Sequence, residues 1–171
     1  MQIAGAHDVP VTDEIFKATD RGAAILATSW LDDYLIAAIK SKLLDDKDTI
    51  KKLFKPSGAL GGLSVKTDVG FVLKLYGKET RDDLHHIAGV RNLFAHWSKT
   101  IDFGSRDIRT ACEKLTITDR IFAAHEGHEP KARPFTRETA RDEFLVNVGH
   151  AVTMLNWIAT QPAVQDPHTK W

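Results

Sequence analysis

The residues with the most chemical potential form the run Arg91-Asn92-Leu93-Phe94-Ala95-His96, which places a guanidinium, an amide and an imidazole close together. On a helix, Asn92 and His96 share one face, whereas Arg91 and His96 point about 140° apart. The planar donor set of Arg91 suits a phosphate group, and a histidine changes its charge near cellular pH. The run therefore predicts a site that holds a phosphate and moves protons.

The same residues also have a structural interpretation. Cationic side chains near a helix C-terminus interact favourably with the helix dipole, and Arg91 could form an ion pair with Asp32 or Asp33 that ties two helices together. Large apolar residues flank both acids, so we expect at least one carboxylate to face a polar group. The sequence alone leaves the catalytic and structural interpretations open.

Other polar groups give weaker predictions. A divalent ion could be held by Asp82, His85 and His86 on a helix, or by His125, Glu126 and His128 in a loop, but neither spacing is an established metal motif. We therefore predict no metal and no cofactor. The glycine-rich segment 58–62 lacks the Lys-Ser/Thr ending of a phosphate-binding P-loop, which excludes that kind of nucleotide site.

Three further sets of residues are assigned structural roles. Cys112 has no obvious basic neighbour in sequence and is interpreted as core packing. His150 is interpreted as a core histidine whose polar atoms are satisfied. The remaining set is basic, lies around the start of the last predicted helix, and is interpreted as a solvated face; it comprises Lys131, Arg133, Arg137 and Arg141.

Composition limits the class of protein. The chain has 171 residues, the usual length of one domain, and its single cysteine allows no internal disulfide. Lys plus Arg and Asp plus Glu number 23 each, which removes the broad positive field of non-specific DNA binding. No uncharged apolar stretch reaches eighteen residues, so we expect a cytoplasmic protein without a membrane span.

Apolar positions recur every three or four residues, which predicts an all-α bundle of five to six helices in a single domain over 1–171, with loose termini at 1–11 and 162–171. Brief β-favouring composition at 116–122 suggests a small hairpin. We expect Gly77 to close the third helix in a left-handed conformation. The expected helices span 12–44 with a break near 19–22, 46–54, 64–76, 79–97, 105–115 and 136–161.

The apolar positions also predict which side chains face the core. The predicted core residues are Ile15, Phe16, Ala23, Leu26, Trp30, Tyr34, Leu35, Ala38 and Ile39 in the first helix, Val65, Val69, Val72, Leu73 and Tyr76 in the third, Leu84, Ile87, Val90 and Phe94 in the fourth, and Phe144, Val148, Ala151, Val152, Leu155 and Ile158 in the last.

Several features stand in an order that resembles the mannitol operon repressor family, over about two thirds of the chain. They are Asp20-Arg21-Gly22-Ala23, Trp30-Leu31-Asp32-Asp33, Phe54, Gly58-Ala59-Leu60, Leu63-Ser64-Val65-Lys66 and the segment 87–96. The resemblance implies an all-helical fold within the wider HEPN group. It also implies a regulator of sugar-alcohol operons.

HEPN nucleases carry an Arg, a polar residue and a His in an R-x(4-6)-H arrangement, which Arg91, Asn92 and His96 match. The resemblance implies that two subunits meet across this helix to form one cleft, with Asp32 or Asp33 as a supporting acid. One His96 would then accept the proton of a ribose 2′-OH while the other protonates the leaving oxygen, with no metal.

No helix-turn-helix with a basic recognition helix is evident in the sequence, so direct reading of DNA is not expected. We predict a homodimeric regulatory module that acts through a protein or RNA partner. The alternative is a metal-independent RNA endonuclease that uses Arg91 and His96.

Overall fold

The structure is a computed structural model that describes residues 9–96, 101–124 and 137–161. All regular secondary structure in these ranges is helical, which confirms the predicted all-α bundle. The helices are α1 (Val9–Lys17), α2 (Asp20–Lys40), α3 (Lys47–Phe54), α4 (Leu63–Val72), α5 (Lys78–His96), α6 (Arg106–Cys112), α7 (Ile117–Ala123) and α8 (Arg137–Thr160).

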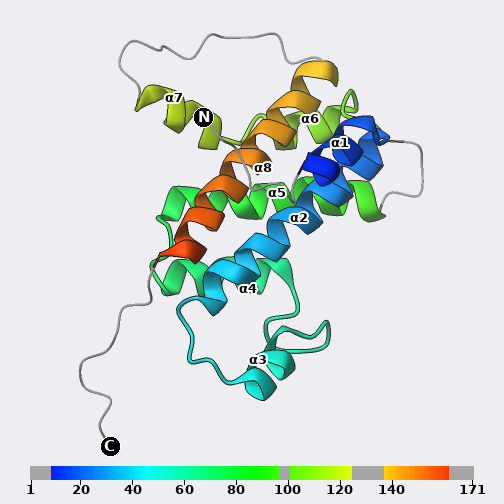
Figure 1. Ribbon diagram of the computed structural model, residues 1–171. Coiled ribbons are helices and arrows are strands. Elements are labelled where there is room, and N and C mark those ends of the chain that lie inside the picture. Colours follow the sequence, from blue (N-terminus) through cyan, green and yellow to red (C-terminus); the bar gives the residue numbers. More distant parts are fainter. Residues whose placement is uncertain (1–8, 97–100, 125–136, 162–171) are drawn as a thin grey trace, which may run out of the picture.

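The long helices α2 and α8 pack along each other at the centre of the bundle, and α5 packs against both (Figure 1). Helix α4 contacts α2 and α5, while α6 and α7 contact α8. Helix α3 stands away from the bundle in a loop that connects α2 to α4 (Figure 1). Three helices, α2, α4 and α5, therefore meet on one side of the molecule.

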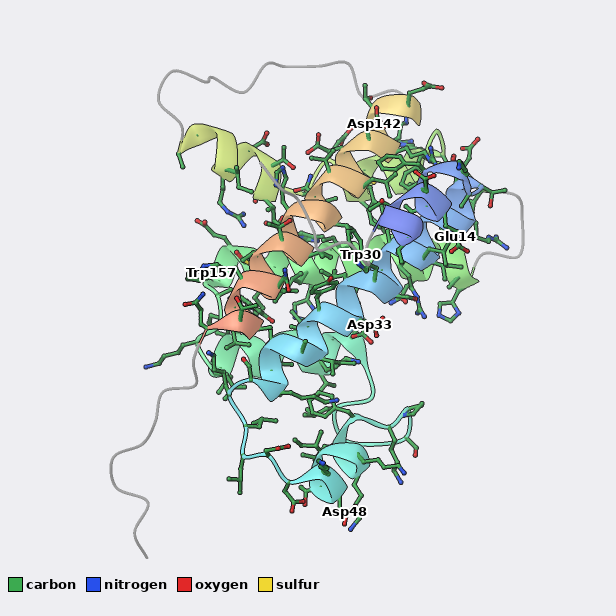
Figure 2. All side chains as sticks on the ribbon, viewed as in Figure 1. Glu14, Trp30, Asp33, Asp48, Asp142 and Trp157 are labelled. Carbon is green, nitrogen blue, oxygen red and sulfur yellow. The ribbon has the colours of Figure 1, made fainter. Side chains whose placement is uncertain are left out.

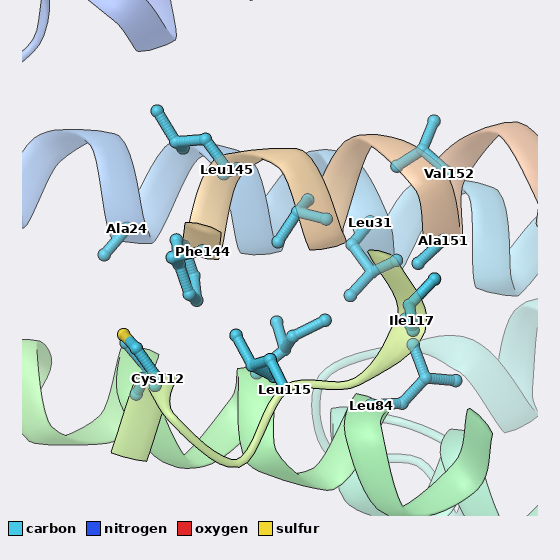
Figure 3. Packing of buried hydrophobic residues seen from close by; sticks show 14 of the residues in the cluster. Ala24, Leu31, Leu84, Cys112, Leu115, Ile117, Phe144, Leu145, Ala151 and Val152 are labelled. Atoms are coloured by element: carbon cyan, nitrogen blue, oxygen red, sulfur yellow. The ribbon is translucent and has the colours of Figure 1, made fainter. Parts of the chain in front are cut away.

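The core lies between α2, α5 and α8, and Figure 3 shows Leu31 and Leu84 facing side chains of α8 and of the segment after α6. Its aromatic centre is a chain of three rings, with centroids 4.9 Å apart for Phe94 and Phe103 and 5.6 Å apart for Phe103 and Phe144. Burying such a side chain stabilises a fold by roughly 1.5–3 kcal/mol. All predicted core positions of α5 and α8 are buried.

The predicted break in the first helix is confirmed, and Thr19 is its cause. The hydroxyl of Thr19 accepts a hydrogen bond from the Gly22 N–H at 3.2 Å, so Thr19 caps α2. The start of the first helix was predicted wrongly: α1 begins at Val9, three residues before the predicted start at Thr12. Phe16, a predicted core residue, is 61% exposed because α1 turns only Ile15 fully inward.

Arg141 is not part of a solvated face, in contrast to the prediction. Its guanidinium donates to the carbonyls of Ile15, Phe16 and Ala18 at 3.0–3.3 Å, and lies 3.5 Å from the Asp20 carboxylate. These carbonyls belong to the last turn of α1 and the residue after it, and the Ile15 carbonyl also accepts from the Ala18 N–H at 3.3 Å. Arg141 therefore joins α8 to the α1–α2 junction.

The predicted hairpin at 116–122 is wrong, because this segment forms α7. Tertiary contacts override its β propensity. The buried carboxylate of Asp83 on α5 accepts hydrogen bonds from the Thr116 N–H at 2.8 Å, the Thr116 hydroxyl at 3.0 Å and Arg120 at 2.6 Å. The Asn147 side chain accepts from the Thr118 N–H at 3.1 Å. Polar contacts at its N-terminal end thus hold α7 against α5 and α8.

Helix α4 also departs from the prediction. Val65 is 46% exposed and Val72 is 76% exposed, whereas the fully buried residues of the helix are Lys66, Thr67 and Gly70. The helix ends at Val72, and the left-handed residue after it is Lys74, with φ 59°, rather than Gly77. The fully buried positions of α4 are therefore polar or small, while Leu63, Val69 and Phe71 pack partly buried against the core.

Helix α2 has the length and mean hydropathy of a membrane-crossing helix. In the 18-residue stretch of α2 that meets this test, 44% of the residues are buried inside the bundle. It also carries three aspartates, at positions 20, 32 and 33. The central helix of a folded bundle passes the same test of length and hydropathy, so this is weak evidence for a membrane span.

Candidate functional site

A hollow of about 300 Å³ lies where α2, α4 and α5 meet. Helix α2 contributes Thr28, Ser29 and Asp32, and α5 contributes Ala88, Arg91 and Asn92. The third wall is the start of α4 and the two glycines before it. Its residues are Gly61, Gly62, Leu63, Ser64 and Val65. The hollow therefore combines three of the predicted site residues, Asp32, Arg91 and Asn92.

The cation that pairs with Asp32 is Lys66. Its ammonium lies 2.7 Å from Asp32 Oδ2 and 3.4 Å from the Gly61 carbonyl, and its side chain is only 2% exposed. A buried ammonium needs such a partner, because an isolated charge would be strongly destabilised away from water. The pair confirms that one of the two acids faces a polar group, and it joins α2 to α4.

Arg91 does not pair with Asp32 or Asp33 in the described part of the chain, so the predicted tie between these residues is wrong. Its Nη1 donates to the Asn92 side-chain oxygen at 2.9 Å, and both side chains are exposed. The reason is that Lys66, which sequence analysis did not consider as a partner, already neutralises Asp32.

The remaining predicted site residues lie elsewhere. Asp33 is exposed on the outer side of α2 (Figure 2). His96 is exposed at the last residue of α5 and does not line the hollow. A second, shallower depression of about 490 Å³ lies between Leu93 and α6, lined also by Arg106, Asp107, Thr110, Ala111 and Lys114. Within one chain, Arg91 and Asn92 thus share a hollow that His96 does not enter.

The start of α4 adds hydrogen-bond donors to the hollow. The first N–H groups of a helix have no carbonyl partner within it, and here these belong to Leu63, Ser64 and Val65. The capping position is Gly62, which has no side chain and makes no side-chain capping bond. Helix dipoles are positive at this end, so this wall of the hollow favours negative charge.

Of the two candidate metal groups, only the group of Asp82, His85 and His86 lies in the described residues, and there no group of three or more His, Cys, Asp or Glu could hold a metal ion. Asp82 is held by Lys78 at 2.6 Å and by Arg81 at 2.7 Å. The hydrogen bonds from Lys78 and Arg81 lower the pKa of Asp82 to about 2. His85 lies 2.9 Å from the Asp68 carboxylate, so it links α5 to α4.

Cys112 is fully buried, as predicted. Burial, with smaller contributions from Glu143 and Glu113, raises the pKa of the Cys112 thiol to about 12. His150 is only half-buried, and burial lowers its pKa. Several residues singled out in the sequence lie outside the described residues, namely His125, Glu126, His128, Lys131, Arg133 and the terminus 162–171.

Sequence reasoning missed Lys66 as a site residue. Its partner Asp32 is 34 positions away, and a lysine in the first turns of a helix is ordinarily exposed. The local signal is weak: Lys66, Thr67 and Gly70 share a helix face on which Leu63 is the large apolar residue, while Val65 and Val72 are exposed.

No family model and no curated protein sequence matches the chain. Solved structures do resemble it. The regulator MtlR of Escherichia coli, solved in complex with HPr, matches with a TM-score of 0.66 and 17% identity, over 89% of this chain and 99% of that chain. The protein YggD of Shigella flexneri 2a, described as a possible transcriptional regulator, matches with a TM-score of 0.64 and 16% identity, over 90% of this chain and 99% of that chain. The chain therefore has the fold of MtlR-like regulators along nearly its whole described length.

Proposed function

We propose that this protein is a cytoplasmic transcription-regulating module that acts by binding a protein partner, in the manner of the mannitol operon repressor family. The observation that carries the proposal is the likeness to E. coli MtlR over 99% of that chain, because MtlR was solved in a complex with HPr. A fold shared at this level makes HPr the first partner to test.

One of the short helices, α7, is unsuited to direct reading of DNA, whereas α3 carries three exposed lysines, Lys47, Lys51 and Lys52. A recognition helix presents basic side chains to the major groove. Helix α7 contains one basic residue, Arg120, and Asp83 engages it at 2.6 Å. The chain also has no net charge, so a general attraction to DNA is absent.

An exposed tryptophan offers a candidate anchor for the partner. Trp157 on α8 is 64% exposed and points away from the bundle (Figure 2), and Val146 on the same helix is 43% exposed. Tryptophan is enriched among the residues that dominate binding energy at interfaces. We expect the partner to cover this face of α8.

Calorimetric titration with E. coli HPr tests the proposal. Trp157→Ala should weaken binding at least about tenfold, because loss of an anchor side chain costs more than about 1.4 kcal/mol. Phe16→Ala is the matched control, since Phe16 is equally exposed, at 61%, but lies on α1. Absence of HPr binding by the wild type would contradict the proposal that HPr is the partner. Equal affinity of the two variants for HPr would contradict the proposal that Trp157 is the anchor.

The second candidate function is metal-independent RNA cleavage by Arg91, Asn92 and His96. One observation favours it over a structural role: all three side chains are exposed, and Arg91 has no carboxylate partner in the described residues. Because Arg91 and His96 diverge around α5, the site needs a second copy of the chain to complete it.

Incubation of wild type, Arg91→Ala and His96→Ala with single-stranded and structured RNA in EDTA tests this candidate. Cleavage by the wild type that both variants lose, at unchanged thermal stability, is expected for a nuclease. Identical traces from the three proteins would exclude it for those substrates. Light scattering tests the homodimer separately, and a particle of about 19 kDa would contradict it.

A further inference from the structure

We propose that the hollow between α2, α4 and α5 binds a small molecule that carries a phosphate group. This goes beyond the proposed function, because the anchor proposed for the protein partner lies on α8 and not at the hollow. It differs from the nuclease candidate in needing neither His96 nor a second copy of the chain. The argument rests on charge, on free hydrogen-bonding groups and on size.

The charge of the hollow is positive when its members are taken together. Asp32 is neutralised by Lys66 at 2.7 Å, so the pair contributes little net charge. Arg91 remains, an exposed guanidinium whose one partner in the described residues is the neutral side chain of Asn92. A guanidinium has five N–H donors, and most of them are left for a ligand. The lining therefore favours an anion with several acceptor oxygens.

Hydrogen-bond donors on a second wall remain to be satisfied. On α4, the N–H groups of Leu63, Ser64 and Val65 lack partners within the helix, and Gly62 provides no cap. The hollow thus offers two sets of donors to an oxyanion, the guanidinium of Arg91 on α5 and these N–H groups on α4.

This donor set suits an oxyanion with several acceptor oxygens. A phosphate group near neutral pH has three such oxygens and a charge of about −1.5 to −2, so it can accept from the guanidinium and from the helix N-terminus at the same time. The volume of the hollow, about 300 Å³, is at the lower end of the range for small-molecule sites. It is larger than a phosphate group alone requires. A small phosphate ester with hydroxyl groups fits this description.

Gly62 provides a sharp test, because it occupies the capping position of α4. Its φ of −90° and ψ of 141° are accessible to any residue, and a Cβ placed there meets no atom within 4 Å. In Gly62→Asp, the new carboxylate should accept from the free N–H groups of α4 and so occupy the anion's place. The variant is expected to melt at a higher temperature than the wild type while losing phosphate binding. A simple loss of folding cannot produce that pair of results.

The experiment is a calorimetric titration of the full chain with inorganic phosphate, glycerol 3-phosphate and sulfate at constant ionic strength. We expect the ester to bind more tightly than sulfate, because the ester fills more of the hollow than an oxyanion alone. Arg91→Gln should lose at least about tenfold in ester affinity. Its matched control is Arg106→Gln, an exposed arginine that lines the other depression and should leave the affinity unchanged.

Three results would overturn the proposal. One is the absence of binding of either phosphate compound up to about 10 mM. Another is equal affinity in Arg91→Gln and Arg106→Gln. The third is undiminished binding by a folded Gly62→Asp protein. HPr binding is measured independently of these titrations, so either proposal can fail without the other.

Discussion

Removal of the Asp83 carboxylate should destabilise the fold strongly, and the contacts of this residue allow the size of the effect to be worked out. Asp83 is 1% exposed and accepts three hydrogen bonds, from the Thr116 N–H, the Thr116 hydroxyl and Arg120, at 2.6–3.0 Å. Hydrogen bonds to a charged group contribute about 1.5–3 kcal/mol each, and loss of one member of a buried pair costs about 3–5 kcal/mol.

The expected loss lies at the lower end of that range. Arg120 is 30% exposed and also lies 3.6 Å from Glu79, so its charge can return to water or to a second acid when Asp83 is removed. We therefore expect Asp83→Ala to lower the free energy of unfolding by about 3 kcal/mol. For a domain of this length, that loss lowers Tm by about 6–12 °C.

Urea unfolding followed by circular dichroism measures the effect, with Asp82→Ala as the control. Asp82 is the neighbouring acid and also pairs with cations, but its side chain is 36% exposed, so its removal should leave the urea midpoint close to that of the wild type. Equal midpoints for the two variants, at unchanged m-values, would refute the reasoning that burial makes the Asp83 contacts strong.

Two further predictions concern titrating groups in the core and on α8. Because burial raises the pKa of Cys112 to about 12, a thiolate-directed reagent at pH 8 should modify this residue only when the protein opens. The rate of modification should therefore rise with urea concentration, and rapid modification of the native protein would contradict the prediction. Burial lowers the pKa of His150, so the unfolded chain binds its proton more readily, and stability should fall as pH drops below about 6.5. Unfolding at pH 7 and pH 5 should show a smaller fall in His150→Gln than in the wild type, and an equal fall would contradict the assignment.

The sequence predicted helices best where one face is apolar and regular. Phe144, Val148 and Leu155 recur at helical spacing and are all buried, because burial of apolar surface dominates the free energy of these elements. Prediction failed where a distant polar group decides the local structure. Helix α7 forms because its first residues bond to Asp83 on α5, more than thirty positions earlier, and no local pattern records that contact.

The candidate site was predicted in part for the same reason. Arg91, Asn92 and Asp32 were identified by residue type, and they do line one hollow. The partner of Asp32 was not identified, since Lys66 is buried only through its position on the polar side of α4. The spacing on α5 also predicted that Arg91 and His96 point in different directions. The structure agrees, because both are exposed but only Arg91 lines the hollow.

The way in which α4 packs has a consequence for motion in the molecule. Its fully buried residues are a lysine, a threonine and a glycine, while Leu63, Val69 and Phe71 pack partly buried against the core. Since α4 forms one whole wall of the hollow and supplies the counter-ion of Asp32, any displacement of this helix would change the shape and the charge of the cavity together.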